Sequence, residues 1–439
     1  MKNKKEIFKE YIRRVYIKIK NIWWLDRNMY LFALEGMLIT IINNIVSINN
    51  NNLFATRMEA NNFELSLVTS LPQFVGMLVL IPGGILSDRM ANKRKMVVAS
   101  LISLSSLYVV IGFTPMFGQF RLIAFICFLA LSVGSLTVYN ASWQAYFSDV
   151  VSIEERNRVF TLRTKGTFLF NTVTPLVTGA LLANTALNSE KIRMHQMFFW
   201  CAALLIFVQI FVLMKISGGS SHRVATIGFR ELKSAAVDLV HNKKLMGFIG
   251  VALFFYMSWQ SDWTLYYIGQ VEYLKLNEAW LSYVSVGGAI VQFLTIGFWS
   301  RMNERFGVRF PIIIGSMALC LFPLSMIYST SLPVGKGGVV FLILSTLSNF
   351  AFATVFLNIP QCLLQVVPEK NKTLSISIYT VMISFSNAVM PIAGVQFYTV
   401  LGSDLRALHI TFYIIFTMRI IATILWTVRW WVMRKELII

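Results

Sequence analysis

The sequence predicts an all-α membrane protein in which twelve transmembrane helices form two pseudo-symmetric six-helix bundles. Three observations lead to this fold class. The 439-residue chain is 56% hydrophobic and only 13% charged, whereas soluble domains carry about 25% charged residues. Apolar runs of about 18 residues or more recur along the chain, and each can cross a bilayer as a helix. The second half of the chain also repeats features of the first half.

The internal repeat has an offset of 216 residues. Asp88-Arg89, at the end of one apolar run, recurs as Glu304-Arg305 at the end of another. The same offset relates Ser66 to Ser282, Val150-Val151 to Val366-Val367, Asn171 to Asn387 and Pro175 to Pro391. Parallel repeats of this kind are found in membrane transporters whose binding site lies between the two halves.

The charge distribution predicts the topology. We expect spans at residues 29–56, 65–87, 96–115, 122–147, 160–186, 195–215, 245–269, 280–299, 310–330, 338–364, 375–400 and 408–431. With both termini in the cytoplasm, the cytoplasmic segments hold 31 Lys and Arg residues and the outer loops hold 7. This asymmetry follows the positive-inside rule for a multi-pass protein of the cell membrane. The net charge of +19 then serves topology and contact with anionic lipid, and we expect no nucleic-acid partner.

The same pattern divides the chain into four parts. Residues 1–28 form a cytoplasmic segment with the spacing of a basic amphipathic helix at the membrane surface. Residues 29–215 form the N-terminal six-helix bundle, and residues 245–439 form the C-terminal bundle with a basic tail. Residues 216–244 form a cytoplasmic linker that begins with a flexible Gly/Ser stretch and continues as an amphipathic helix.

Several chemistries have no support in the sequence. No G-x-x-x-x-G-K-[ST] phosphate-binding loop occurs, so we do not expect this chain to hydrolyse ATP. The four cysteines and four histidines lack metal-ligand spacing, so we expect no metal site. No nucleophile–base pair indicates an enzyme. We therefore expect no enzymatic activity and no cofactor, apart from a proton that could be co-transported.

A short motif at the end of the second span predicts a cytoplasmic gate. Its glycine lets two helices approach, and its acid can meet the positive N-terminal end of a neighbouring helix. The gate candidates are Gly84, Asp88, Arg89 and Lys93 in the first half, and Glu304, Arg305, Gly307 and Arg309 in the second half. The first set resembles the G-x-x-x-D-R-x-G-R-R signature of the major facilitator superfamily (MFS), with Ala91 and Asn92 as departures.

The resemblance extends over nearly the whole chain through the twelve spans and the parallel repeat. It implies the MFS fold and a secondary transporter whose bundles rock about a midplane site. It also implies that the first, fourth, seventh and tenth spans line the cavity. The family's drug–proton antiporters carry an Arg deep in the fourth helix, but here Arg121 lies at the outer start of that span. The subfamily therefore stays open.

Two acids lie within spans, where a buried carboxyl can exchange a proton. Glu35 in the first span is the better candidate for proton coupling, and the alternative is a carboxylate paired with a basic neighbour. Asp262 in the seventh span is the second candidate, and it could instead cap a broken helix or reach water. Arg419 lies midway along the twelfth span, and the sequence gives no partner for it.

Amides and aromatic residues gather in the four spans that the resemblance places around the cavity. The cavity-lining candidates are Asn43, Ser47, Asn50, Asn51, Tyr139, Asn140, Trp143, Gln144, Trp259, Gln260, Asn358 and Gln361. Most of the polar residues of the first span share one helical face. The alternative is that these side chains form hydrogen bonds between helices during assembly.

These features together predict a monomeric secondary active transporter that works by rocker-switch alternating access. We expect a small organic solute, neutral or amphiphilic, because few spans supply the Arg or Lys residues that a sugar phosphate would require. Proton coupling through Glu35 and export are the expected mode and direction, and import stays open because the sequence does not determine the direction. The alternative is a non-transporting sensor or lipid-handling protein with the same fold.

Overall fold

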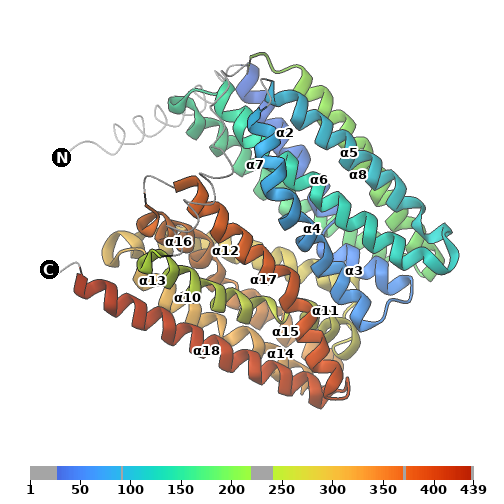
Figure 1. Ribbon diagram of the computed structural model, residues 1–439. Helices are drawn as coiled ribbons and strands as arrows, with labels where there is room; N and C mark the ends of the chain where they lie inside the picture. Colours follow the sequence, from blue (N-terminus) through green and yellow to red (C-terminus); the bar gives the residue numbers. More distant parts are fainter. Residues whose placement is uncertain (1–26, 90–91, 219–240, 369–371, 437–439) are drawn as a thin grey trace, which may run out of the picture.

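The computed structural model describes residues 27–89, 92–218, 241–368 and 372–436. Its helices form two bundles that lie side by side (Figure 1). The first bundle contains α2 (Arg27–Ile45), α3 (Ile48–Arg57), α4 (Asn62–Arg89), α5 (Lys93–Phe113), α6 (Arg121–Val150), α7 (Ile153–Ala183) and α8 (Asn188–Met214). The expected amphipathic helix at 4–24 and most of the 216–244 linker lie outside the described residues.

The second bundle is built from more pieces, because several of its spans are interrupted. It contains α10 (Lys243–Gln260), α11 (Trp263–Ile268), α12 (Glu278–Phe306), α13 (Arg309–Leu319), α14 (Leu321–Thr330), α15 (Val334–Ser348), α16 (Phe350–Val366), α17 (Lys372–Val400) and α18 (Leu405–Glu436). The short turns are η1 (Thr114–Met116), η2 (Gly118–Phe120) and η3 (Gly269–Tyr273), the last of them a π-helix.

The start of α2 and the end of α18 lie at the same end of the molecule (Figure 1). We call this the terminal end and the opposite one the distal end. The α4–α5, α6–α7, α12–α13 and α16–α17 connections belong to the terminal end, since an even number of spans separates each from a terminus. The α3–α4, α7–α8 and α17–α18 connections belong to the distal end.

Helix boundaries follow the 216-residue repeat. Helix α4 begins at Asn62, and α12 begins 216 residues later at Glu278. Helices α5 and α13 begin at Lys93 and Arg309, with the same separation. Helices α6 and α16 also end 216 residues apart. The two bundles are therefore two copies of one helical plan, as the sequence predicts.

The first span of each copy is interrupted within one residue of the matching position. In the first bundle the chain leaves α2 after Ile45 and enters α3 at Ile48. The Asn50 side chain donates to the Ile45 carbonyl at 2.8 Å, and the Asn51 side chain donates to the Val46 carbonyl at 3.2 Å. Buried carbonyls without a partner are costly, so these two amides stabilise the break.

The matching break in the second bundle uses different chemistry. It lies between α10 and α11, at Ser261 and Asp262. Arg419 of α18 donates Nη2 to the Trp259 carbonyl at 3.4 Å. It also donates Nη1 to the carbonyl of Leu319, where α13 ends, at 2.7 Å. The Arg419 guanidinium thus donates hydrogen bonds to backbone carbonyls at two helix breaks.

Eleven helices of the described residues are long and apolar enough to cross a membrane, whereas the sequence predicts twelve spans. The difference is the seventh span, expected at 245–269, which is less apolar than the others because Ser258, Gln260, Ser261 and Asp262 lie at or beside its break. Its longer piece also begins with Lys243 and Lys244. Helix α10, α11 and η3 follow one another from the terminal end to the distal end, so the order of twelve spans is retained.

The hydrophobic core is divided unequally. Buried apolar side chains of the first bundle join those of the distal half of the second bundle, such as Leu265, Phe341 and Phe412, in one continuous cluster. The terminal half of the second bundle forms a separate cluster around Phe248 and Trp426. Between the bundles, α4 packs with α17 and α7 packs with α12. The bundles therefore share a core at the distal end.

Candidate functional site

A buried carboxylate lies in the terminal half of the first bundle. Glu35 of α2 is completely buried. Its Oε1 accepts hydrogen bonds from the Tyr139 hydroxyl of α6 and from Gln209 Nε2 of α8, the latter at 2.7 Å. Gln209 Nε2 also lies 3.2 Å from the Tyr139 hydroxyl oxygen. Side chains from α6 and α8 therefore both donate to one carboxylate oxygen of α2.

The other carboxylate oxygen faces a cation. Arg163 Nη1 of α7 lies 3.8 Å from Glu35 Oε2, and its guanidinium carbon lies 3.9 Å from the centre of the Trp143 ring. Gly36 makes room for this arrangement, because a Cβ there would lie 2.2 Å from Arg163 Nε. Glu35 Oε2 and Arg163 Nη1 have no hydrogen-bond partner among the described residues. This oxygen is buried and accepts no hydrogen bond, so a proton placed on it would displace no donor.

A second charged pair is buried in the other bundle. Asp262 Oδ2 accepts a hydrogen bond of 2.5 Å from Arg419 Nη2. Both side chains are at most 2% exposed. Asp262 occupies the N-cap position of α11, but its side chain makes no capping hydrogen bond. The partner that the sequence did not give for Arg419 is thus the other buried acid.

Polar contacts join the bundles at the distal end. Glu278, at the start of α12, forms ion pairs with Arg57 at the end of α3 and with Lys191 of α8, the latter at 2.7 Å. Glu278 is only 3% exposed. The Thr56 and Tyr267 hydroxyls lie 2.8 Å apart. These contacts hold the first bundle against the second around one buried carboxylate.

Two further contacts extend this seam toward the middle of the molecule. Asn49 Nδ2 donates to Ser285 Oγ at 3.0 Å, although both side chains remain partly exposed. Nearer the centre, the Phe168 ring of α7 stacks on the Phe293 ring of α12, with 4.2 Å between their centres. The contact between α12 and the first bundle is thus polar near the distal end and apolar nearer the centre.

The gate candidates are only partly described. Helix α4 includes Gly84, Asp88 and Arg89, but their side chains lie outside the described part of the structure. Lys93 Nζ forms an ion pair of 3.1 Å with Asp149, within its own bundle. The proposed gate between the bundles therefore stays a prediction.

The second copy of the motif differs from a simple loop. Glu304 and Arg305 belong to the last turn of α12, because this helix continues to Phe306, seven residues past the expected end of the span. Both side chains are exposed. Gly307 follows with φ of 76°, a conformation that favours glycine. Arg309 Nε donates to Gln365 Oε1 at 3.1 Å, again within one bundle.

The cavity candidates fall into three groups. Amides with exposed side chains are Asn43, Asn140, Gln144 and Gln361. The second group consists of buried or capping side chains with contacts inside one bundle. Hydrogen bonds are made by Ser47, Asn50, Asn51, Tyr139 and Asn358, whereas Trp143 stacks on Phe147. Gln260 is buried, whereas Trp259 is partly buried and packs against Phe352. Cavity lining stays a prediction for all of them.

Sequence reasoning missed two residues of the Glu35 cluster. Gln209 stands alone in the apolar run of α8, and a lone buried amide in such a run is a signal that could have identified it. Arg163 lies at the start of the expected fifth span (160–186), and the sequence analysis treats it as one of the cytoplasmic cations that set the topology. It lies inside α7, which extends ten residues before it to Ile153. Among the described residues, no cluster of His, Cys, Asp or Glu could hold a metal ion.

Two six-span bundles that meet at one end, each with a buried ion pair, define a multi-pass membrane transporter of the alternating-access type. The sequence model of the Major Facilitator Superfamily matches residues 28–296 and 254–437, and the chain belongs to this family. A comparison with curated protein sequences found no match.

Solved structures show the same fold. The nucleoside transporter NupG has a TM-score of 0.69 and 11% identity, with 92% of this chain and 99% of that chain covered. A D-xylose–proton symporter has a TM-score of 0.67 and 14% identity, with 91% and 96% covered. A bacterial homologue of the human lysosomal transporter Spinster, inward-facing and unoccupied, has a TM-score of 0.63 and 11% identity, with 91% and 96% covered.

Proposed function

We propose that this transporter moves a small organic solute across the cell membrane by a rocker-switch motion coupled to a proton. One observation carries the proposal. The hydrogen bonds and ion pairs between the bundles, within the described residues, lie in the distal half. The shared hydrophobic core lies there too, whereas the terminal half of the second bundle has its own core. Such a state is closed at one end, as alternating access requires.

The orientation that we propose makes this state inward-facing. The excess of Lys and Arg in the segments of the terminal end supports a cytoplasmic location for that end. The closed distal end then faces the outside. The similarity to the Spinster homologue in an inward-facing conformation supports this interpretation.

The solute that we propose is neutral or amphiphilic. The two ion pairs within the spans, Glu35–Arg163 and Asp262–Arg419, each balance one charge inside one bundle. A multiply charged solute would need cations that are not already paired with buried acids. The exposed amides of α2 and α6, such as Asn43 and Gln144, can exchange hydrogen bonds with hydroxyl, carbonyl or amine groups.

We assign the proton to Glu35. Protonation of Oε2 would remove the negative charge that Arg163 faces at 3.8 Å. The guanidinium would then lose its counter-charge while keeping its contact with the Trp143 ring. A ligand that differs in affinity for the two states shifts their populations, and the proton would act as such a ligand here. Export is the direction that we favour, because an amphiphilic solute reaches the open terminal end from the cytoplasm.

Reconstitution into proteoliposomes tests the proposal. A solute panel of neutral and amphiphilic compounds would be added with and without a pH gradient, while an enclosed pH-sensitive dye reports proton movement. We expect at least one solute to accumulate with the gradient and to move protons. Glu35→Gln should abolish accumulation driven by the gradient but retain solute exchange at equal pH.

The matched control is Glu59→Gln, because Glu59 is an exposed acid that pairs with Arg121 on the distal surface. It should behave as the wild type. Accumulation that persists in Glu35→Gln would remove proton coupling from Glu35. If the folded wild type moves neither solute nor proton, the chain would instead fit a sensor or lipid-handling protein.

A further inference from the structure

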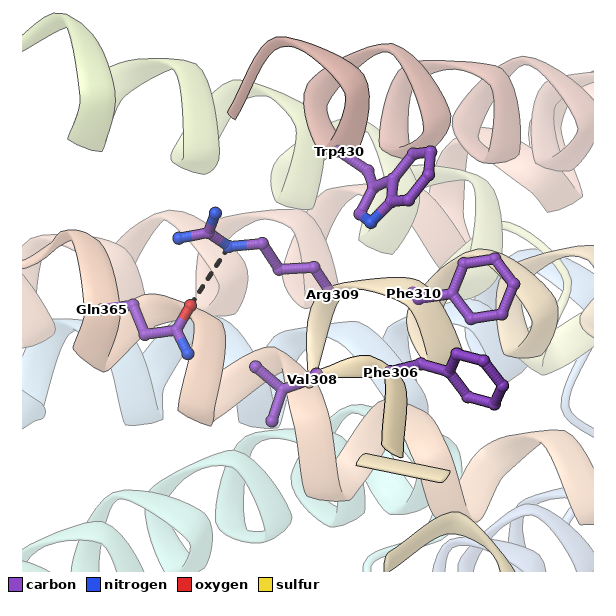
Figure 2. A pocket seen from close by; sticks show the side chains of 7 residues that line it. Phe306, Val308, Arg309, Phe310, Gln365 and Trp430 are labelled. Carbon is purple, nitrogen blue, oxygen red and sulfur yellow. Dashed lines mark hydrogen bonds between the residues drawn. The ribbon is translucent and has the colours of Figure 1, made fainter. Parts of the chain in front are cut away.

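A basic and aromatic pocket lies at the terminal end of the second bundle, outside the Glu35 and Asp262 sites. It is lined by the α12–α13 connection, the end of α16 and the end of α18, through Phe306, Gly307, Val308, Arg309, Phe310, Gln365 and Trp430. Figure 2 shows the Arg309 side chain extending toward Gln365, with the Trp430 ring nearer its backbone end. The cavity volume is about 570 Å³, within the range of roughly 300–1,000 Å³ that is usual for ligand sites.

The pocket carries the positive charge of Arg309, and a hydrogen bond orients its guanidinium. Arg309 Nε donates to Gln365 Oε1 at 3.1 Å, which fixes the plane of the guanidinium (Figure 2). Among the described residues no hydrogen bond uses the Nη atoms of Arg309, so their N–H groups can bind an oxyanion. An adjoining cavity is lined by Arg309, Trp430 and a second cation, Arg429. No acid is among the described residues that line either cavity.

The aromatic side chains match the interface of a bilayer. The rings of Phe306 and Phe310 lie 5.4 Å apart, and those of Phe310 and Trp430 lie 5.9 Å apart. Trp is enriched where headgroups meet acyl chains, and basic residues at that depth attract anionic headgroups. Aromatic rings add little to the binding of a soluble anion. A phospholipid, in contrast, can contact the cation with its phosphate and the rings with its apolar part.

An apolar path leads from the pocket along α13 and α14. Phe310, Ile314 and Met317 follow at spacings of four and three residues, which places them on one face of α13. Met317 is 55% exposed, and Leu321 at the start of α14 is 56% exposed. Leu321 also lines a third, separate cavity of about 380 Å³, together with Ala318, Leu324 and Leu344. An acyl chain can therefore lie along the helix below a headgroup bound at Arg309.

We propose that this pocket binds an anionic phospholipid. The phosphate accepts hydrogen bonds from the Arg309 Nη groups, Arg429 adds attraction, and an acyl chain covers Phe310 and Met317. Arg309 also belongs to the second copy of the gate motif, so a bound lipid holds the α12–α13 connection. The site stands apart from the proposed transport function, because lipid binding can be measured without a transported solute.

Native mass spectrometry of the purified full chain tests the site, with dioleoyl-phosphatidylglycerol and dioleoyl-phosphatidylcholine as probes. We expect tighter binding of phosphatidylglycerol by the wild type and a loss of about tenfold in Arg309→Gln, the scale of one charge-assisted hydrogen bond. Arg309→Lys keeps the charge and should retain more of the binding than Arg309→Gln. Binding retained by Arg309→Lys would also show that substitution at this position does not by itself unfold the site.

Arg301→Gln is the matched control, since Arg301 is an exposed cation of α12 at the same end that does not line the pocket. It should bind phosphatidylglycerol as the wild type does. Equal binding of the two lipids would overturn the proposal, as would a loss in Arg301→Gln that equals the loss in Arg309→Gln. Displacement of phosphatidylglycerol by millimolar inorganic phosphate would also overturn it, because the lipid chains would then contribute nothing.

Discussion

Breaking the Asp262–Arg419 pair should destabilise the second bundle severely. The perturbation is Arg419→Met, which keeps a long apolar side chain and removes the guanidinium. Arg419 is 2% exposed, and it contacts Asp262 and the carbonyls of Trp259 and Leu319. The variant would leave a buried carboxylate without its cation and two helix-end carbonyls without this donor.

The magnitude follows from the burial of both partners. Removing one member of a buried ion pair costs about 3–5 kcal/mol. Asp262→Asn should cost a similar amount, because it leaves the Arg419 charge buried. The double variant carries neither charge. Its destabilisation should fall short of the sum of the two single costs by about 3 kcal/mol, at the upper end of coupling between contacting residues.

The assay is unfolding of the purified protein in mixed micelles by increasing the mole fraction of sodium dodecyl sulfate, followed by tryptophan fluorescence. The wild type, both single variants and the double variant form one cycle. Additive costs would refute the reasoning, because they would mean that the two side chains stabilise the fold independently. Arg419→Met with the stability of the wild type would refute it as well.

Three further predictions concern the distal seam and two close approaches. Glu278→Gln should raise the population that is open at the distal end about tenfold, the scale of one lost charged contact, and spin-label distances between the distal loops of the two bundles should lengthen. Gly36→Ala should cost about 1–3 kcal/mol by overpacking, because its Cβ meets only the flexible Arg163 side chain. Gly394→Ala should cost more, since its Cβ would lie 2.0 Å from the backbone oxygen of Ser261. Thermal unfolding should rank the two glycine variants in that order, and the reverse order would contradict this explanation.

The sequence predicts the plan of the fold because its signals are long and repeated. Apolar runs set the number and order of spans, and the matched Asp88 and Glu304 motifs set the repeat. The helix breaks were less visible. The sequence contains Ser47 and Asn50, but hydropathy does not show where α2 ends. That boundary depends on which carbonyls find donors after folding.

The site was predicted only in part. The position of an acid along a span shows that it lies in the membrane, but it does not show which side chains from other helices contact it. Glu35 and Asp262 stand out as acids within apolar runs. Their partners are far away in sequence: Gln209 is 174 residues from Glu35, and Arg419 is 157 residues from Asp262. Asn50 and Asn51 were assigned to a cavity because amides avoid lipid, and the structure shows that both donate to backbone carbonyls. Polarity alone does not distinguish these two uses.

The paired interruption of the first and seventh spans separates what the two halves share from what they do not. Both copies break within one residue of the same repeat position, yet one stabilises the break with asparagine side chains and the other with an arginine from its last helix. The two halves therefore share the position of the break and differ in the side chains that stabilise it.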